Sequence, residues 1–266
     1  MRLIYFGLVF FLIVFLPATA MAAYISFDTT VTTTVKDNKL VVQISAVNRG
    51  DEAAHDVLAE IKVLGQQRAI NKQAVVKPGD FYRGQISFDL ANTISGQYPL
   101  VATLYYTDAN HYGFSALIVQ AFAFKTAALA GKLVGAGPPI EVWEKGTAKV
   151  VLQNNGDEML FTETFLVLPR ELAAEVNNLK NDLRAKTKLT LEYPIKNLSA
   201  LNGSTYQVYA VCEYRTPEGR PQVMVLPLVI KVAEPRNILG INYLAAICGL
   251  GMLIIILAGA QFFKKK

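Results

Sequence analysis

The sequence is poor in the residues from which most catalytic and metal sites are built. Among 266 residues there are two cysteines and two histidines. Cys248 lies inside an apolar run and Cys212 is alone in the central region, so we expect no disulfide framework. His55 and His111 lie beside turn residues, without the closely spaced ligand sets of metal sites. The sequence therefore predicts no metal and no cofactor, and we interpret Cys212 as a small buried hydrophobe.

The motifs of the common enzyme classes are also absent. The sequence contains no Gly-x-Ser-x-Gly elbow, no phosphate-binding P-loop and no dinucleotide fingerprint. The acid pairs Asp51-Glu52 and Asp157-Glu158 lie in turns and offer fewer oxygens than a calcium loop needs. We therefore predict that the protein is not an enzyme.

The central region has no excess of positive charge. Four of the 26 basic residues, Arg2 and the three C-terminal lysines, lie at the two ends of the chain. The remainder contains 22 basic and 21 acidic residues. Nucleic-acid binding requires a face of unopposed Lys and Arg, so we expect no nucleic acid as a partner.

Charge is entirely missing from residues 239–263, which include no Asp, Glu, Lys, Arg or His. A bilayer core of about 30 Å is crossed by roughly 20 helical residues, so this run is predicted to be a single transmembrane helix. The lysine tail, residues 264–266, is then cytoplasmic, and the residues before 236 lie on the other side of the membrane. Ala245, Gly249 and Gly251 form a candidate face for helix–helix association, because small residues let helix backbones approach closely.

The N-terminal residues 1–22 have the features of a secretory signal peptide. Arg2 precedes an apolar stretch, Pro17 ends it, and small residues follow at the spacing of a cleavage site. An uncleaved first transmembrane helix is the alternative. With a prokaryotic origin, we expect the protein in the cytoplasmic (inner) membrane, with its N-terminal domains periplasmic or extracellular.

Short strand patterns fill the first half of the chain. Alternating or β-branched segments occur at residues 29–35, 40–47, 57–64, 81–90, 98–106 and 114–124, separated by turns such as Lys77-Pro78-Gly79-Asp80. Short strands at this spacing, without a strong helical pattern, are typical of a β-sandwich. Residues 24–125 are therefore predicted to form one immunoglobulin-like sandwich.

The second half repeats the first. After a small-residue linker at 126–131, the segment Gln153-Asn154-Asn155-Gly156-Asp157-Glu158 matches Val47-Asn48-Arg49-Gly50-Asp51-Glu52. The Tyr-rich strands at Tyr98 and Tyr206 are a second matched pair, about 108 residues apart. The predicted fold class is all-β, with sandwiches at 24–125 and 132–235 and one C-terminal transmembrane helix.

One passage departs from the strand pattern. Leu172, Val176, Leu179 and Leu183 are spaced as on one face of a helix. The repeat predicts strand at this place, so residues 170–184 are left open between a strand and a short inserted helix.

Aromatic residues form the candidate binding surface. Tyr98, Tyr105, Tyr112, Trp143 and Tyr206 lie in or beside the strand patterns of the two copies. They could form a strip that binds a glycan or a partner, although packing within the core and across strands is the usual role of such residues.

The order of these motifs resembles the CARDB-like group of immunoglobulin-like modules in prokaryotic surface proteins. The resemblance rests on Asn48-x-Gly50, Lys77-Pro78-Gly79-Asp80 and Gly96-x-Tyr98, whereas the second copy keeps Asn154-x-Gly156 and Tyr206 but lacks the Pro-Gly turn. It implies spacers and interaction platforms without catalytic residues. We therefore expect a membrane-anchored scaffold subunit with a protein partner in a membrane or envelope complex. The alternatives are an adhesion or glycan-binding protein, a hydrolase, or a precursor cleaved after Pro235.

Overall fold

The computed structural model describes residues 24–126, 132–233, 237–238, 241–242 and 247–253, and nearly all of its regular structure is β-strand. The predicted all-β class is therefore confirmed. The strand segments predicted for the first copy are all present, and most are longer than their patterns by a few residues.

The first half of the chain forms two sheets. One has the strand order β1-β2-β6 and the other β4-β3-β7-β8, with β5 paired to β3. Their strands are β1 (Phe27–Lys36), β2 (Lys39–Asn48), β3 (Ala54–Val63), β4 (Gln66–Ala69), β5 (Gln73–Val76), β6 (Phe81–Asp89), β7 (Gly96–Thr107) and β8 (Gly113–Phe124). Alternate residues of both sheets point inward and close a core around Leu40, Ile61, Tyr82, Leu100 and Phe124, each at most 1% exposed.

The second half forms another pair of sheets, with the orders β13-β15-β11-β9 and β10-β17-β16-β12-β14. Their strands are β9 (Leu133–Ala136), β10 (Ile140–Val142), β11 (Lys145–Asn154), β12 (Leu160–Val167), β13 (Leu172–Ala174), β14 (Asn178–Leu183), β15 (Lys188–Asn197), β16 (Thr205–Arg215) and β17 (Pro221–Val232). A separate core is centred on Leu152, Tyr193, Ile195 and Ile230. We refer to these two units as the first and second sandwich.

Residues 170–184 contain strands and no helix. β13 pairs with β15, and β14 pairs with β12. The helical spacing is misleading because its four apolar residues share no face: Leu172 and Leu183 are buried, whereas Val176 is 48% exposed. Tertiary strand pairing outweighs the local periodicity here.

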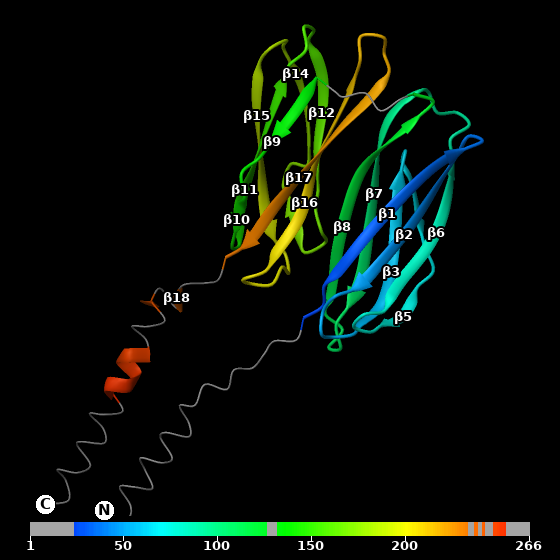
Figure 1. The fold of residues 1–266 in the computed structure, drawn as a ribbon. Helices are drawn as coiled ribbons and strands as arrows, with labels where there is room; N and C mark the ends of the chain where they lie inside the picture. Colours follow the sequence, from blue (N-terminus) through cyan, green and yellow to red (C-terminus); the bar gives the residue numbers. More distant parts are fainter. Residues whose placement is uncertain (1–23, 127–131, 234–236, 239–240, 243–246, 254–266) are drawn as a thin grey trace, which may run out of the picture.

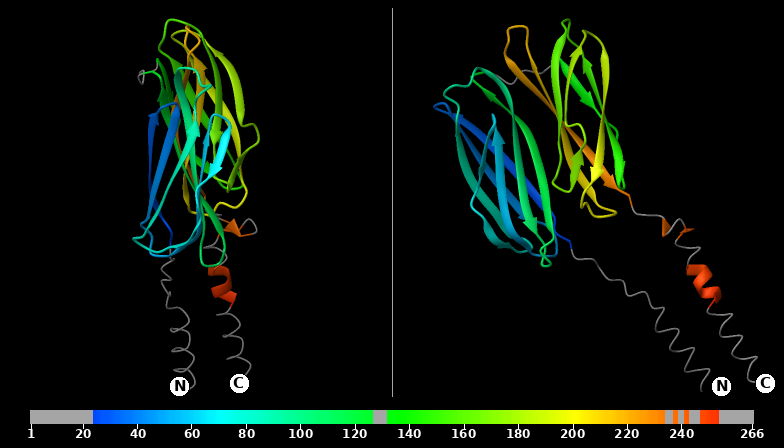
Figure 2. Two further views of the ribbon diagram at one scale, coloured as in Figure 1. Left: turned by 90° about the vertical axis from the view of Figure 1, so that its right-hand side faces the viewer. Right: turned by 180° about the vertical axis from the view of Figure 1, so that it is seen from behind.

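The two sandwiches lie side by side and run in opposite directions (Figure 1). The first sandwich is entered at one end, through Tyr24, and left at the other, after β8. The second begins near that far end with β9, and β17 returns the chain to the starting end (Figure 2). Tyr24 and Val232 therefore lie at the same end of the molecule, which we call the terminal end.

Beyond the second sandwich the structure describes a small hairpin and a short helix. β18 (Asn237–Ile238) pairs with β19 (Ile241–Asn242), and residues 247–253 are helical. Within the run 239–263, residues 241–242 are strand where the sequence predicts helix; the paired Asn237 and Asn242 are weak helix formers. In the described part of the chain, no helix has both the length and the apolarity needed to cross a bilayer. The predicted signal peptide, residues 1–22, lies outside the described residues, as do nearly all of the linker and the lysine tail.

Candidate functional site

The outer faces of two sheets, one from each sandwich, are pressed together. Along β7 and β8, even-numbered residues point into the first core and odd-numbered ones point outward. The outward residues meet β12, β16 and β17 of the second sandwich. The buried members of this contact are Leu117, Val119, Tyr209, Val211 and Val223, flanked by the half-buried Val101, Phe165, Val167 and Val225.

This contact makes one body of the two sandwiches. Val211 at its centre is fully buried, and the other four buried side chains are at most 7% exposed. The Tyr209 hydroxyl lies 3.4 Å from the Leu117 carbonyl oxygen and donates a hydrogen bond to it across the contact. Burial of apolar surface contributes about 25 cal/mol per Å², so a face of this kind resists separation.

A buried carboxylate crosses the same contact near the terminal end. Glu171, in the connection between β12 and β13, is 1% exposed. Its Oε1 accepts a hydrogen bond from the Ser115 backbone N–H at 2.8 Å, and its Oε2 accepts one from the Ser115 hydroxyl at 2.7 Å. The Arg170 N–H in turn donates to Ser115 Oγ at 3.1 Å. We call Glu171 and Ser115 the carboxylate latch, because together they join the start of β8 to the second sandwich.

The repeated Asn-x-Gly motifs have the same structural role in both copies. Asn48 and Asn154 are fully buried. Asn48 Nδ2 donates to the carbonyl oxygens of Glu52 and Val76, and its Oδ1 accepts from the Gly50 N–H. These side chains staple turns, which satisfies backbone groups that would otherwise be buried without partners.

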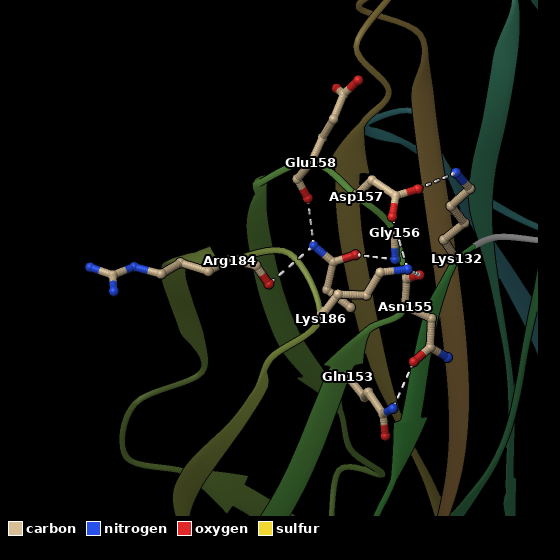
Figure 3. Close-up of polar contacts among 9 residues, drawn as sticks. Lys132, Gln153, Asn155, Gly156, Asp157, Glu158, Arg184 and Lys186 are labelled. Carbon is tan, nitrogen blue, oxygen red and sulfur yellow. Dashed lines mark hydrogen bonds and ion pairs between the residues drawn. The ribbon is translucent and has the colours of Figure 1, made fainter.

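In the second copy, Asn154 donates to the carbonyl oxygens of Glu158, Leu183 and Arg184 and accepts from the Gly156 N–H at 2.8 Å. The surrounding polar groups lie on the surface of this turn (Figure 3).

The acidic residue of the second turn is neutralised by lysines. Asp157 lies 2.9 Å from Lys186 Nζ and 3.7 Å from Lys132 Nζ (Figure 3). The hydrogen bond from Lys186 is the main reason that the pKa of Asp157 is lowered. All three side chains are well exposed. The Asp157 carboxylate is therefore paired with two lysines at the solvent-exposed surface, and it is not available as a ligand for a cation.

A groove runs along one side of the contact between the sandwiches. One section of it, about 730 Å³, is lined by residues of both sandwiches, among them Leu64, Tyr98, Phe161, Asn181 and Gln222. The Nδ2 of Asn181 and the Nε2 of Gln222 are buried without a hydrogen-bond partner.

Two carboxylates face each other in this groove. Glu163 on β12 and Glu213 on β16 are directly paired across the strands. Burial is the larger cause, and Glu163 the smaller, of a raised pKa at Glu213. Lys180 balances Glu163 at 3.6 Å.

The predicted aromatic residues do not form one strip. Tyr98 is 9% exposed and packs in the first core, and Tyr206 packs against the second core. Strand alternation turns both side chains toward a core, where Tyr98 is buried and Tyr206 is half-buried. Tyr105 is half-buried on β7. Only Tyr112 and Trp143 are largely exposed, at 68% and 51%, and each lies in a turn.

The remaining candidates are not brought together. Cys212 is fully buried, and burial raises the pKa of its thiol to about 11, so it is uncharged at neutral pH. His55 lies on β3 and His111 in the β7–β8 turn. Among the described residues, no three His, Cys, Asp or Glu side chains are grouped as metal ligands. Gly249 and Gly251 lie in the short helix with open space around them, whereas Ala245 is outside the described residues.

Fold and contacts together define an all-β protein whose described part consists mainly of two joined β-sandwiches. No protein-family model matches the sequence, and no curated protein sequence matches it. The chain is similar to the native conformation of E. coli alpha-2-macroglobulin, with 12% identity and a TM-score of 0.34 over 79% of this chain and 17% of that one. It is also similar to red sea bream transglutaminase, with 12% identity and a TM-score of 0.30 over 82% of this chain and 32% of that one. The chain thus spans at most a third of the length of these proteins.

Proposed function

We propose that this chain is a non-enzymatic, membrane-anchored scaffold subunit of an envelope or membrane protein complex. Its signal peptide would direct export, its two immunoglobulin-like sandwiches would lie outside the cytoplasm, and residues 239–263 would anchor them. The observation that carries this proposal is the joining of the sandwiches into one body whose described ends both lie at the terminal end. A body held rigidly beside a bilayer can keep a partner at a fixed height.

The C-terminal segment supports the anchor. The described helical residues Ile247, Leu250 and Met252 are 63–64% exposed. Apolar side chains on an uncharged helix are stable when a bilayer covers them. Ala233, which follows β17 directly, is tied to the second sandwich by a hydrogen bond from its N–H to the Val142 carbonyl oxygen at 2.8 Å. Only a few residues would therefore separate the anchor from Ala233, which is fixed to the second sandwich.

Two measurements test the proposal. The full-length chain should stay with the membrane through carbonate extraction, and a chain truncated after Pro235 should be released. Affinity purification of the full-length chain in mild detergent should recover a partner in fixed stoichiometry. Recovery of a clean monomer after native extraction and cross-linking would refute the scaffold role.

A second candidate is glycan binding in the groove between the sandwiches. It is favoured by the exposed Phe161 ring, 66% accessible, beside the unpaired amide groups of Asn181 and Gln222. An aromatic face with planar amide donors is suited to sugar rings and hydroxyls. Binding of the full-length chain to a glycan array, lost in Phe161→Ala but kept in Phe81→Ala, would favour this function. Absence of any glycan signal would remove it.

A further inference from the structure

Large apolar side chains are exposed on the loops of the terminal end. In the second sandwich they are Trp143, Leu198 and Leu201, which are 51%, 56% and 50% exposed. In the first sandwich Tyr112, in the β7–β8 turn, is 68% exposed. We call these four residues the terminal rim. Because exposing them to water is unfavourable, a group of them on one end of a molecule indicates a contact surface.

The rim residues of the second sandwich are held in place by hydrogen bonds. Asn197 Nδ2 donates to the Trp143 carbonyl oxygen at 2.9 Å, and the Asn197 N–H donates to the Glu144 carbonyl oxygen at 2.9 Å. These bonds join the loop after β10 to the loop after β15. The Gly203 N–H donates to the Val232 carbonyl oxygen at 2.9 Å, which ties the second loop to the end of β17.

The carboxylate latch brings the first sandwich into the same surface. The Glu171 side chain holds Ser115, which follows the β7–β8 turn, and its carbonyl oxygen accepts hydrogen bonds from the N–H groups of Leu198 and Ser199. One residue thus connects the segment next to Tyr112 with the loop of Leu198. Figures 1 and 2 agree in placing the β7–β8 turn and the β15–β16 loop at the terminal end.

The chain's own path identifies what covers this rim. β17 ends at Val232 beside the rim, and the uncharged run begins at residue 239. The intervening residues, even fully extended, span about 20 Å at most. Trp and Tyr prefer the headgroup level of a bilayer, and exposed leucines enter its acyl boundary. A bilayer anchored by residues 239–263 would lie within reach of the rim.

We propose that the terminal rim rests in the interfacial layer of the bilayer, so that the double sandwich stands with its terminal end on the lipid surface at a fixed tilt. This inference rests on the proposed anchor. Three loops from two sandwiches would then contact lipid beside one transmembrane segment. The sandwiches would be unable to swivel about the short connection, because rotation would lift either Tyr112 or Trp143 out of the layer.

The sole tryptophan of the chain makes the contact measurable, because all tryptophan emission reports on Trp143. The full-length chain is reconstituted into phosphatidylcholine vesicles, with and without bromine on the acyl chains near the headgroups. We expect brominated lipid to remove most of the Trp143 emission and acrylamide in the water to quench it weakly. Replacing Leu198 and Leu201 together by serine should weaken the lipid quenching.

A matched variant places the tryptophan away from the terminal end of the second sandwich. In the background Trp143→Phe, the substitution Phe161→Trp moves the tryptophan to another exposed aromatic position, at the start of β12. Its emission should respond to acrylamide and be unaffected by bromine. If the anchored wild-type chain shows this aqueous response at Trp143, the rim inference is refuted while the anchor stands. If carbonate extracts the chain from the vesicles, the anchor and the rim contact are refuted together.

Discussion

Replacing Glu171 by alanine should loosen the contact between the sandwiches. The substitution removes two hydrogen bonds to a charged acceptor, at 2.8 and 2.7 Å, and leaves the Ser115 N–H and hydroxyl without that acceptor. Ser115 is 7% exposed, so water cannot readily replace the carboxylate. Bonds to charged groups contribute about 1.5–3 kcal/mol each. Because the cost of burying the carboxylate is recovered at the same time, we expect a net destabilisation of about 2–4 kcal/mol.

Guanidinium denaturation of the full-length chain in detergent micelles measures this change. Trp143 emission reports on the second sandwich, and far-ultraviolet circular dichroism reports on both. Glu171→Ala should lower the midpoint in both signals, and Ser115→Ala should have a smaller effect because the backbone bond to Oε1 remains. The exposed Glu175, four residues further on, is the matched control; its alanine variant should stay within about 0.5 kcal/mol of wild type.

A double-mutant cycle between Ser115 and Glu171 separates the latch from local effects. The two substitutions should be non-additive by more than about 0.5 kcal/mol, as expected for side chains in direct contact. Additive effects, or a Glu171→Ala change no larger than that of the Glu175 control, would refute the latch.

Three further predictions concern the buried asparagines, the groove carboxylate Glu213 and the buried thiol of Cys212. Asn48→Ala and Asn154→Ala should each destabilise the chain by about 2–4 kcal/mol in thermal denaturation, because buried carbonyl groups lose their donors; an effect as small as that of a surface change would contradict the staple. The pKa of Glu213 is raised from 4.5 on folding, so the native state holds this proton more tightly and stability should fall as pH rises from 4.5 through the folded pKa. Glu213→Gln should therefore stabilise the chain at neutral pH, with a gain that disappears below pH 4.5 in pH-dependent denaturation. In a Cys248→Ser background, Cys212 should react with maleimide only after unfolding, and rapid labelling of the native chain would show that the thiol is accessible.

The strands could be predicted because the pattern that specifies them lies within each short segment of sequence. The alternation of apolar residues in β2 and β7 indicates which side chains face a core. The turn residues near Asn48 and Pro78 mark where strands end. The repeat was equally informative, since Asn48 and Asn154 make matching hydrogen bonds in the two copies.

The contact between the sandwiches could not be predicted from alternation alone. A strand that is apolar on both faces, such as β8 with Leu117 and Val119 outward, has the signature of a doubly covered sheet. Nothing local says which surface covers it. The aromatic strip fails for the opposite reason: Tyr98 and Tyr206 occupy inward positions, so a cluster in sequence is divided between two cores.

The contact between the sandwiches is formed by equivalent sheets of the two copies. Each copy contributes the outer face of its equivalent sheet, β3-β7-β8 in one and β12-β16-β17 in the other, and the copies are antiparallel. By the strand registers, Val101 on β7 corresponds to Tyr209 on β16, and Leu117 on β8 corresponds to Val225 on β17, whereas Val119 corresponds to Pro227. Two-fold symmetric pairs bury the same patch on both partners. Because both halves of this contact belong to one chain, its formation does not depend on the concentration of the protein.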